Sequence, residues 1–330
     1  RGVPDFLISQ GLLERLAKEL PISQNLSEYD GILSTHQYSS FVLAQRKTDI
    51  HSDVPLINIH TDCTPFPLVE HSGINFHAGA IPKSMVTGAI QRKMVVTGIP
   101  VRKDFFYDET TPKEDNILVL GGADGFGNIL EISDFVEEFS QDYKTFLFCG
   151  RSQEAYTRLR DRHPEQTALK YVENPAELFK KSKFLITKAS GVTITEALHA
   201  GCIPIYAPAI LSWEEEAARL LSSVGIGVYL PDFGSTSKGF LRLLLQSEEQ
   251  QKLVRERSQQ FSIRDSAKLI VDLLEGKVPT APSSVPLALV DDMKRYEQYF
   301  ADAQSMQETA KYLNEKIKRW IKDNEPNTND

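Results

Sequence analysis

Short apolar runs alternate with longer amphipathic stretches along most of the chain. Buried parallel strands read as continuous apolar runs, and helices repeat their apolar positions every three to four residues. The pattern therefore predicts an α/β protein with parallel sheets. Strands are expected within residues 30–38, 55–62, 94–98, 116–120, 145–149, 169–172, 184–187, 203–207 and 225–230, and helices at 12–20, 129–139, 192–200, 238–274 and 287–323.

The stretch from Phe184 to Tyr206 predicts a strand, a tight turn, a helix and a second strand. Ser190 is a candidate N-cap, and Gly191 allows a ligand to approach the backbone closely. The free N–H groups of such a helix start favour a diphosphate. Glu196, about one turn further on, can accept two hydrogen bonds from a ribose diol. The alternative is an ordinary strand–helix unit in which Glu196 is simply a solvated residue.

Polar side chains follow the first two predicted strands. His36 comes after the first strand and Asp62 ends the second. Open α/β sheets bind their ligands at the carboxyl ends of the strands, which makes both residues candidates for a site. Helix capping and an ordinary strand exit explain the same residues equally well.

Several segments, in order, resemble UDP-sugar glycosyltransferases that make glycosyldiacylglycerols. These are the monogalactosyldiacylglycerol synthases and the processive diacylglycerol glucosyltransferases. The similar segments lie at residues 29–37, 60–62, 98–102, 121–127 and 186–198. The resemblance implies the GT-B fold, in which two Rossmann-like doubly wound parallel-sheet domains face a cleft.

The resemblance also implies roles for individual residues. The turn formed by Ser190, Gly191, Val192 and Thr193 matches the segment that holds the UDP diphosphate, and Glu196 matches the residue that binds the ribose. By the same resemblance Gly122 and Gly125 line the donor cleft, and the backbone of Tyr171 and Val172 contacts uracil. Trp213, Glu214 and Glu215 fall in the sugar-binding segment, where Ser212 and Trp213 replace the family's Gly-Gln. This departure leaves the donor sugar open.

The family's usual base lies in a Gly-Gly-Gly-His loop that this sequence does not contain. Because the chain starts at Arg1, we expect an N-terminal βα unit to precede it. His36 and Asp62 are then the candidate bases within the sequence.

The length and composition of the chain predict its domains, its compartment and the partners that it can bind. A chain of 330 residues fits two domains, predicted at 1–100 and 101–278, followed by an amphipathic helix at 287–323. The net charge of −8 argues against nucleic-acid binding. Three cysteines without metal-like spacing are expected to be reduced, as in the cytoplasm. The basic end of the last helix suits either the cytoplasmic face of an anionic membrane or packing on this chain or on a second copy.

The expected activity is metal-independent transfer of a hexose (Glc, Gal or GlcNAc) from a UDP-sugar to a lipid hydroxyl, with diacylglycerol as the acceptor. UDP-sugar is then a substrate, and no cofactor is expected. Two alternatives stay open, namely a catalytically inactive nucleotide-sugar-binding or scaffold protein and a sugar-nucleotide epimerase.

Overall fold

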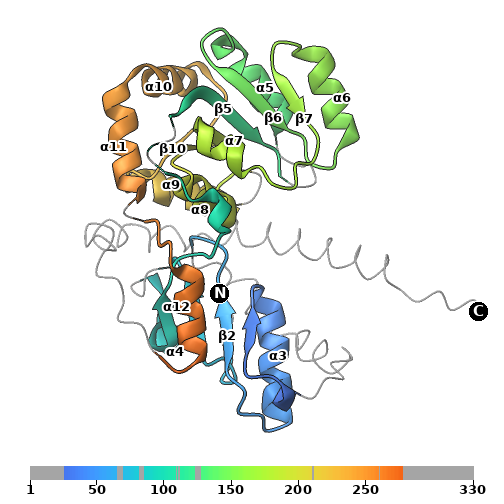
Figure 1. The fold of residues 1–330 in the computed structure, drawn as a ribbon, viewed down its shortest axis with the longest axis vertical. Helices are drawn as coiled ribbons and strands as arrows, with labels where there is room; N and C mark the ends of the chain where they lie inside the picture. The colour runs from blue at the N-terminus through green and yellow to red at the C-terminus, as the bar shows by residue number, and fades with distance from the viewer. Residues whose placement is uncertain are drawn as a thin grey trace, which may run out of the picture.

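The computed structural model describes residues 26–64, 70–81, 85–108, 110, 112–122, 128–209, 212–259 and 261–277. It forms two lobes, each built on a parallel sheet, which meet end to end (Figure 1). The helices predicted at 12–20 and 287–323 lie outside the described residues.

The first lobe holds a four-stranded parallel sheet in the order β1-β2-β3-β4. A short helical turn, η1 (Leu26–Glu28), precedes the sheet. The main helix, α3, follows β1 and buries Phe41, Val42 and Ala44. The elements of this lobe are β1 (Ile32–Ser34), α3 (Gln37–Asp49), β2 (Leu56–Ile59), β3 (Phe76–Gly79), α4 (Gly88–Lys93) and β4 (Met94–Val96).

The second lobe follows η3 (Lys103–Phe105) and holds six parallel strands in the order β10-β9-β8-β5-β6-β7. The chain builds outward from β5 to β7, then returns to the other side of β5 with β8. This reversal is the topological switch point at which doubly wound sheets bind ligands. Its elements are β5 (Glu114–Leu120), α5 (Ile129–Val136), η4 (Glu137–Phe139), β6 (Lys144–Phe148), α6 (Gln153–Arg162), β7 (Thr167–Leu169), α7 (Ala176–Lys181), β8 (Ser182–Thr187), α8 (Gly191–His199), β9 (Ile203–Tyr206), α9 (Ser212–Ser223), β10 (Val228–Tyr229), α10 (Ser235–Gln246) and α11 (Glu248–Gln259).

Helices cover both faces of this second sheet, which explains its apolar strands. Ile117 and Val119 of β5 face one core cluster, whereas Leu118 between them faces the other. Successive side chains of a strand point to opposite faces, so a strand that is buried on both faces must be apolar throughout. Burying these strands fixes the positions of the loops at their carboxyl ends.

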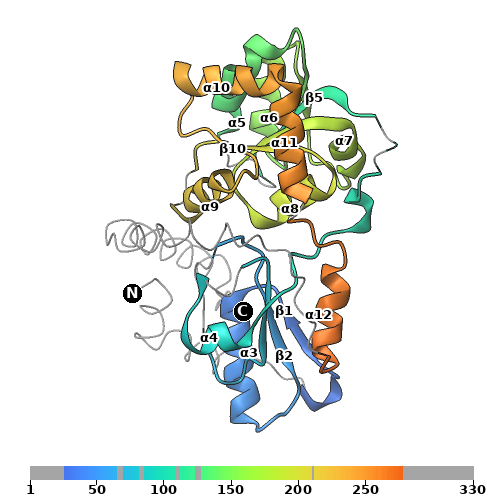
Figure 2. The same cartoon turned by 90° about the vertical axis from the view of Figure 1, so that its left-hand side faces the viewer.

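The last described helix, α12 (Ser266–Leu274), lies beside the first lobe in both views (Figures 1 and 2). Its Ile270 and Leu273 pack with Ile57 and Ile59 of β2. The predicted segment 101–278 thus contains the second sheet together with a helix that contacts the first sheet.

Several boundaries differ from those predicted, and the strand β3 was not predicted. The strand expected at 169–172 is β7, which ends at Leu169, and the strand expected at 225–230 contains two residues in β10. Both lie at the edges of the sheet, where a single neighbour limits pairing. The run expected as one helix at 238–274 divides into α10, α11 and α12. The sequence predicted a single helix because its apolar periodicity continues across the breaks.

Candidate functional site

The N-terminus of α8 faces the first lobe at the switch point of the second sheet. Ser190 occupies the N-cap position with an extended backbone (φ −86°, ψ 125°), but within the described structure its side chain makes no capping hydrogen bond. The Gly191 N–H lies beside the Asp62 carboxylate of the first lobe and opposes the rise in the pKa of that carboxyl. A carboxylate beside a helix start is the arrangement that the helix dipole favours.

The two lobes approach each other closely at Gly191. A Cβ atom on Gly191 would lie 2.2 Å from the carbonyl oxygen of Thr61 and 2.8 Å from the Cα of Asp62. Both neighbours are backbone atoms, so a side chain here would force the lobes apart. Gly191 therefore permits a close backbone contact between the lobes, whereas the approach of a ligand at this glycine stays a prediction.

Glu196 lies on α8, partly buried. Burial raises the pKa of its carboxyl to about 7, and the positive charge of Arg102 opposes this shift. Arg102 follows β4 and donates a hydrogen bond to Asn174 across the linker (3.3 Å). In its ionised form, this carboxylate can accept one hydrogen bond from each of the two hydroxyl groups of a diol.

Lys188 and Glu214 form an ion pair beside the N-terminus of α8, with 2.5 Å between Nζ and Oε1. The Glu214 side chain is 8% exposed and the Lys188 side chain 42% exposed, so the lysine keeps access to solvent. Burial and the neighbouring Glu214 raise the pKa of Asp62, and Lys188 and the Gly191 N–H oppose the rise. The three charged side chains thus form one electrostatic unit that spans both lobes.

A cavity of about 190 Å³ lies at the carboxyl ends of β1 and β2 and reaches α9 of the second lobe. It brings together three residues that the sequence singled out separately, namely His36, Asp62 and Trp213. Asn58 and His60 also line it. Hydrogen bonds join Asn58 to Ser40 (2.7 Å) and His60 to His77 (3.0 Å). The cavity is thus polar on the side of the first lobe.

The other residues predicted for the donor site are outside the group formed by Asp62, Lys188 and Glu214. Tyr171 is 52% exposed in the loop after β7, with the Arg151 guanidinium 4.6 Å from its ring centre, and Val172 packs against the second core cluster of the sheet. Glu215 pairs with Arg219 on α9. Val192 is exposed, Thr193 is partly buried, and Gly122 has a φ of 84° directly after β5, whereas Gly125 lies outside the described residues.

Sequence reasoning missed Lys188 and the pair Asn58 and His60. Lys188 directly follows a buried strand, where a charged residue interrupts an apolar run, and this was the available signal. Asn58 lies in β2, which is buried throughout, and His60 directly follows this strand and is also buried. Polar residues inside a buried strand require partners, and this requirement was a second signal.

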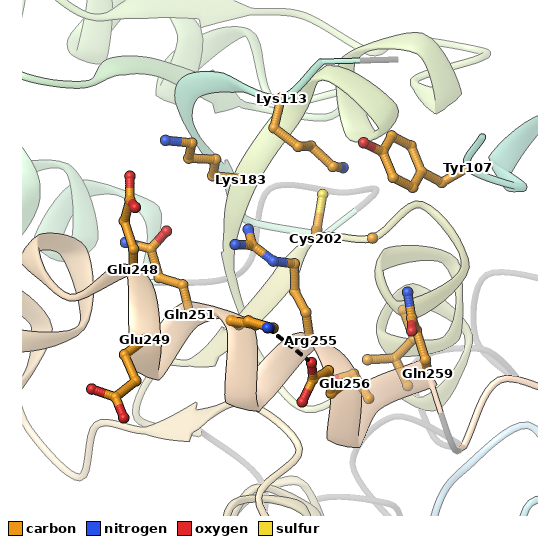
Figure 3. Close-up of a pocket in the computed structure, with 14 residues that line it drawn as sticks. Tyr107, Lys113, Lys183, Cys202, Glu248, Glu249, Gln251, Arg255, Glu256 and Gln259 are labelled. Carbon is orange, nitrogen blue, oxygen red and sulfur yellow. Dashed lines mark ion pairs between the residues drawn. The ribbon is translucent and has the colours of Figure 1, made fainter. Parts of the chain in front are cut away.

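A larger cavity, of about 780 Å³, lies at the opposite end of α8 (Figure 3). Lys113, Cys202 and Arg255 line it together with one face of α11. Because Cys202 precedes β9 and Lys113 precedes β5, this cavity lies at the amino ends of the strands. It is therefore separate from the cleft between the lobes.

The fold and this cleft define the class of protein: the chain has the GT-B fold. No model of a protein family matches the sequence. The solved structures that it resembles include MurG from Acinetobacter baumannii, with a TM-score of 0.55 and 15% identity over 80% of this chain and 77% of that one. S. aureus MnaA, solved with UDP, has a TM-score of 0.59 and 14% identity over 83% of this chain and 84% of that one.

Curated relatives then confirm the resemblance to processive diacylglycerol glucosyltransferases that the motifs indicated. The processive diacylglycerol beta-glucosyltransferase of Bacillus pumilus is 25% identical over 238 residues, which cover 66% of this chain and 62% of the relative. The Bacillus cereus protein of the same name is 24% identical over 292 residues, covering 82% and 74% respectively. This chain thus spans less than two thirds of the length of the Bacillus pumilus relative.

Proposed function

We propose that the protein transfers a hexose from a UDP-sugar to a lipid hydroxyl, with diacylglycerol as the acceptor. The observation that carries the proposal is the start of α8, an anion-accepting helix N-terminus at a switch point, with the partly buried Glu196 on the same helix. The names of the Bacillus relatives supply the acceptor class, and the UDP complex of S. aureus MnaA supports the nucleotide.

In the proposed donor complex, the diphosphate takes the place of the Asp62 carboxylate at the N–H groups of α8. Glu196 accepts the hydrogen bonds of the ribose diol. Trp213, Glu214 and Glu215 lie on the helix that follows β9, on the side expected for the sugar. Lys188 contributes positive charge where negative charge develops on the departing diphosphate.

The reaction forms a bond between the acceptor oxygen and the anomeric carbon of the sugar. At the same time the bond from that carbon to the β-phosphate oxygen breaks, and UDP leaves. The acceptor hydroxyl must lose its proton. Asp62 is the proposed base, because its raised pKa favours proton uptake and it is freed when the diphosphate replaces it at Gly191. His36, in the same cavity, is the second candidate.

Access to a lipid acceptor does not require a membrane-spanning segment in this part of the chain. Across the described residues, the model has no helix that is both long and apolar enough to cross a bilayer. The helix predicted at 287–323 is our candidate for the contact with lipid.

The decisive experiment is calorimetry with UDP on the wild type and on Glu196→Ala. Hydrogen bonds to a charged group contribute about 1.5–3 kcal/mol, so we expect UDP to bind at least about tenfold more weakly to the variant. Glu154→Ala, which removes an exposed carboxylate on α6, is the matched control and should bind like the wild type. Equal affinity for UDP in all three proteins would exclude the ribose role.

The acceptor is tested separately, by UDP release from UDP-Glc and UDP-Gal with and without vesicles that contain diacylglycerol. We expect release to depend on the lipid and to fall in Asp62→Asn. Release that is independent of the lipid would argue against a lipid acceptor while leaving the UDP site intact.

A further inference from the structure

A second cluster of titratable groups lies on the second lobe, away from the cleft between the lobes. It joins Glu137 of η4 with His163 and Glu165 in the turn between α6 and β7. These segments lie at the amino ends of β6 and β7, whereas the donor cleft lies at the carboxyl ends of the strands. Figure 1 shows α6 on the outer side of this lobe. The cluster therefore has no part in the proposed transfer reaction.

His163 is the buried centre of the cluster, with a side chain that is 3% exposed. Its Nε2 lies 2.7 Å from Oδ1 of Asp134, and Asp134 also pairs with Arg162. Its Nδ1 is buried and has no hydrogen-bond partner among the described residues. That nitrogen lies 3.4 Å from a carboxylate oxygen of Glu165 and 3.7 Å from one of Glu137.

The hydrogen bond to Asp134 determines what Nδ1 can do. With the proton on Nε2, Nδ1 keeps a free electron pair close to two carboxylate oxygens, so three electron-rich atoms lie near one another. Neither Glu137 nor Glu165 has a lysine or arginine partner within the described part of the chain. A proton on Nδ1 could satisfy only one of the two oxygens, whereas a dication between them would bind all three atoms.

We propose that Glu137, His163 and Glu165 form a binding site for a divalent cation, with Zn²⁺ as the best match. Two ligands of a tetrahedral Zn²⁺ at about 2.1 Å lie about 3.4 Å apart, close to the separations observed. The three ligand atoms all lie within 4.8 Å of one another. Asp134 completes the carboxylate–histidine–metal arrangement that orients a metal-binding imidazole.

The backbone around the site is already fixed in place. The Nε2 group of Gln166 donates to the carbonyl of Ser133 (3.1 Å), and the Ser133 hydroxyl donates to Gln166 Oε1 (2.8 Å). These bonds join the end of α5 to the turn that carries His163 and Glu165. The cation would stabilise this junction at the outer edge of the second sheet.

The test measures Zn²⁺ binding to tag-free protein by calorimetry, with bound metal counted by mass spectrometry after dialysis. We expect one Zn²⁺ per chain in the wild type and in the control Glu154→Gln, and no stoichiometric Zn²⁺ in His163→Gln. Glu165→Gln should weaken binding at least tenfold, and Asp134→Asn by about ten- to a hundredfold, as for other groups that orient metal ligands.

Thermal unfolding supplies a second readout, because a cation that binds the folded state raises the melting temperature. Zn²⁺ should raise it in the wild type and in Glu154→Gln, but not in the double variant Glu137→Gln/Glu165→Gln. These two carboxylates are exposed, so the double variant keeps the test valid even if His163→Gln does not fold. Unchanged Zn²⁺ binding in the double variant, or no stoichiometric Zn²⁺ in the wild type, would overturn the proposal.

Discussion

At the scale of single residues, burial raises the pKa of carboxyl groups and lowers the pKa of histidines. In the second lobe, burial raises the pKa of Glu196 to about 7. In the first lobe, burial lowers the pKa of His60 to about 3 and that of His77 to about 4. In both cases the low-polarity surroundings disfavour the charged form. The protein therefore combines a carboxyl group whose pKa is raised to about 7 with buried histidines whose pKa values are lowered.

The two histidines predict how stability depends on pH. Unfolded histidine takes up a proton below about pH 6.5, whereas His60 and His77 resist protonation in the folded state. At these two positions the unfolded state then binds more protons, so their contribution to the free energy of unfolding falls as the pH drops below about 6.5, whereas carboxyls with a raised pKa, such as Glu196, contribute in the opposite direction. Urea unfolding between pH 7.5 and 4.5 measures this slope. We expect His77→Gln to reduce the slope and the exposed His51→Asn to preserve it; equal slopes in all three proteins would contradict the assignment.

At the scale of elements, α8 is held at both ends by groups from outside the helix. The Asp62 carboxylate lies beside its first N–H group, which opposes the rise in the pKa of that carboxyl. Lys113 reaches the other end, where its Nζ donates to the carbonyls of Ala200 (2.5 Å) and Phe179 (3.4 Å). A cation at the C-terminus and an anion at the N-terminus both interact favourably with the helix dipole. The position of the candidate site thus depends on the anchoring of this helix.

We expect Lys113→Met to destabilise the protein by about 1–3 kcal/mol, because it removes the side-chain donor to the Ala200 carbonyl at the end of α8. Lys252→Met is the matched control, since Lys252 is exposed and its ion pair with Glu256 is long, at 3.8 Å. Chemical denaturation of both variants measures the difference. A loss of stability no larger than that of the control would show that Lys113 does not anchor α8.

The elements also show how far sequence patterns reach. The strand, turn and helix around Gly191 were predictable, because a buried strand followed by small residues has few other solutions. The pairing of Lys188 with Glu214 was not predictable, since it joins two elements that meet only in the folded lobe. Likewise, the apolar face of α12 is visible in the sequence, but periodicity does not identify the sheet that it covers.

At the scale of the whole molecule, the candidate site depends on how closely the two lobes approach. His36 and Asp62 come from the first lobe, whereas Glu196 and Trp213 come from the second. The linker after β4 and the return of α12 to the first sheet join the lobes twice. Because the bound donor and the proposed base lie on different lobes, the separation of the lobes controls whether they can meet.

Gly191→Ala tests this dependence directly. The added Cβ would lie 2.2 Å from the Thr61 carbonyl oxygen, so the lobes must separate or α8 must shift. We expect a larger radius of gyration by X-ray scattering and a transferase rate lower by about a hundredfold, the typical cost of an error of about 1 Å in positioning. Gly239→Ala is the control, because a Cβ on Gly239 meets nothing within 4 Å. If Gly191→Ala keeps both the scattering profile and the rate of the control, the approach of the lobes at Gly191 is not required for transfer.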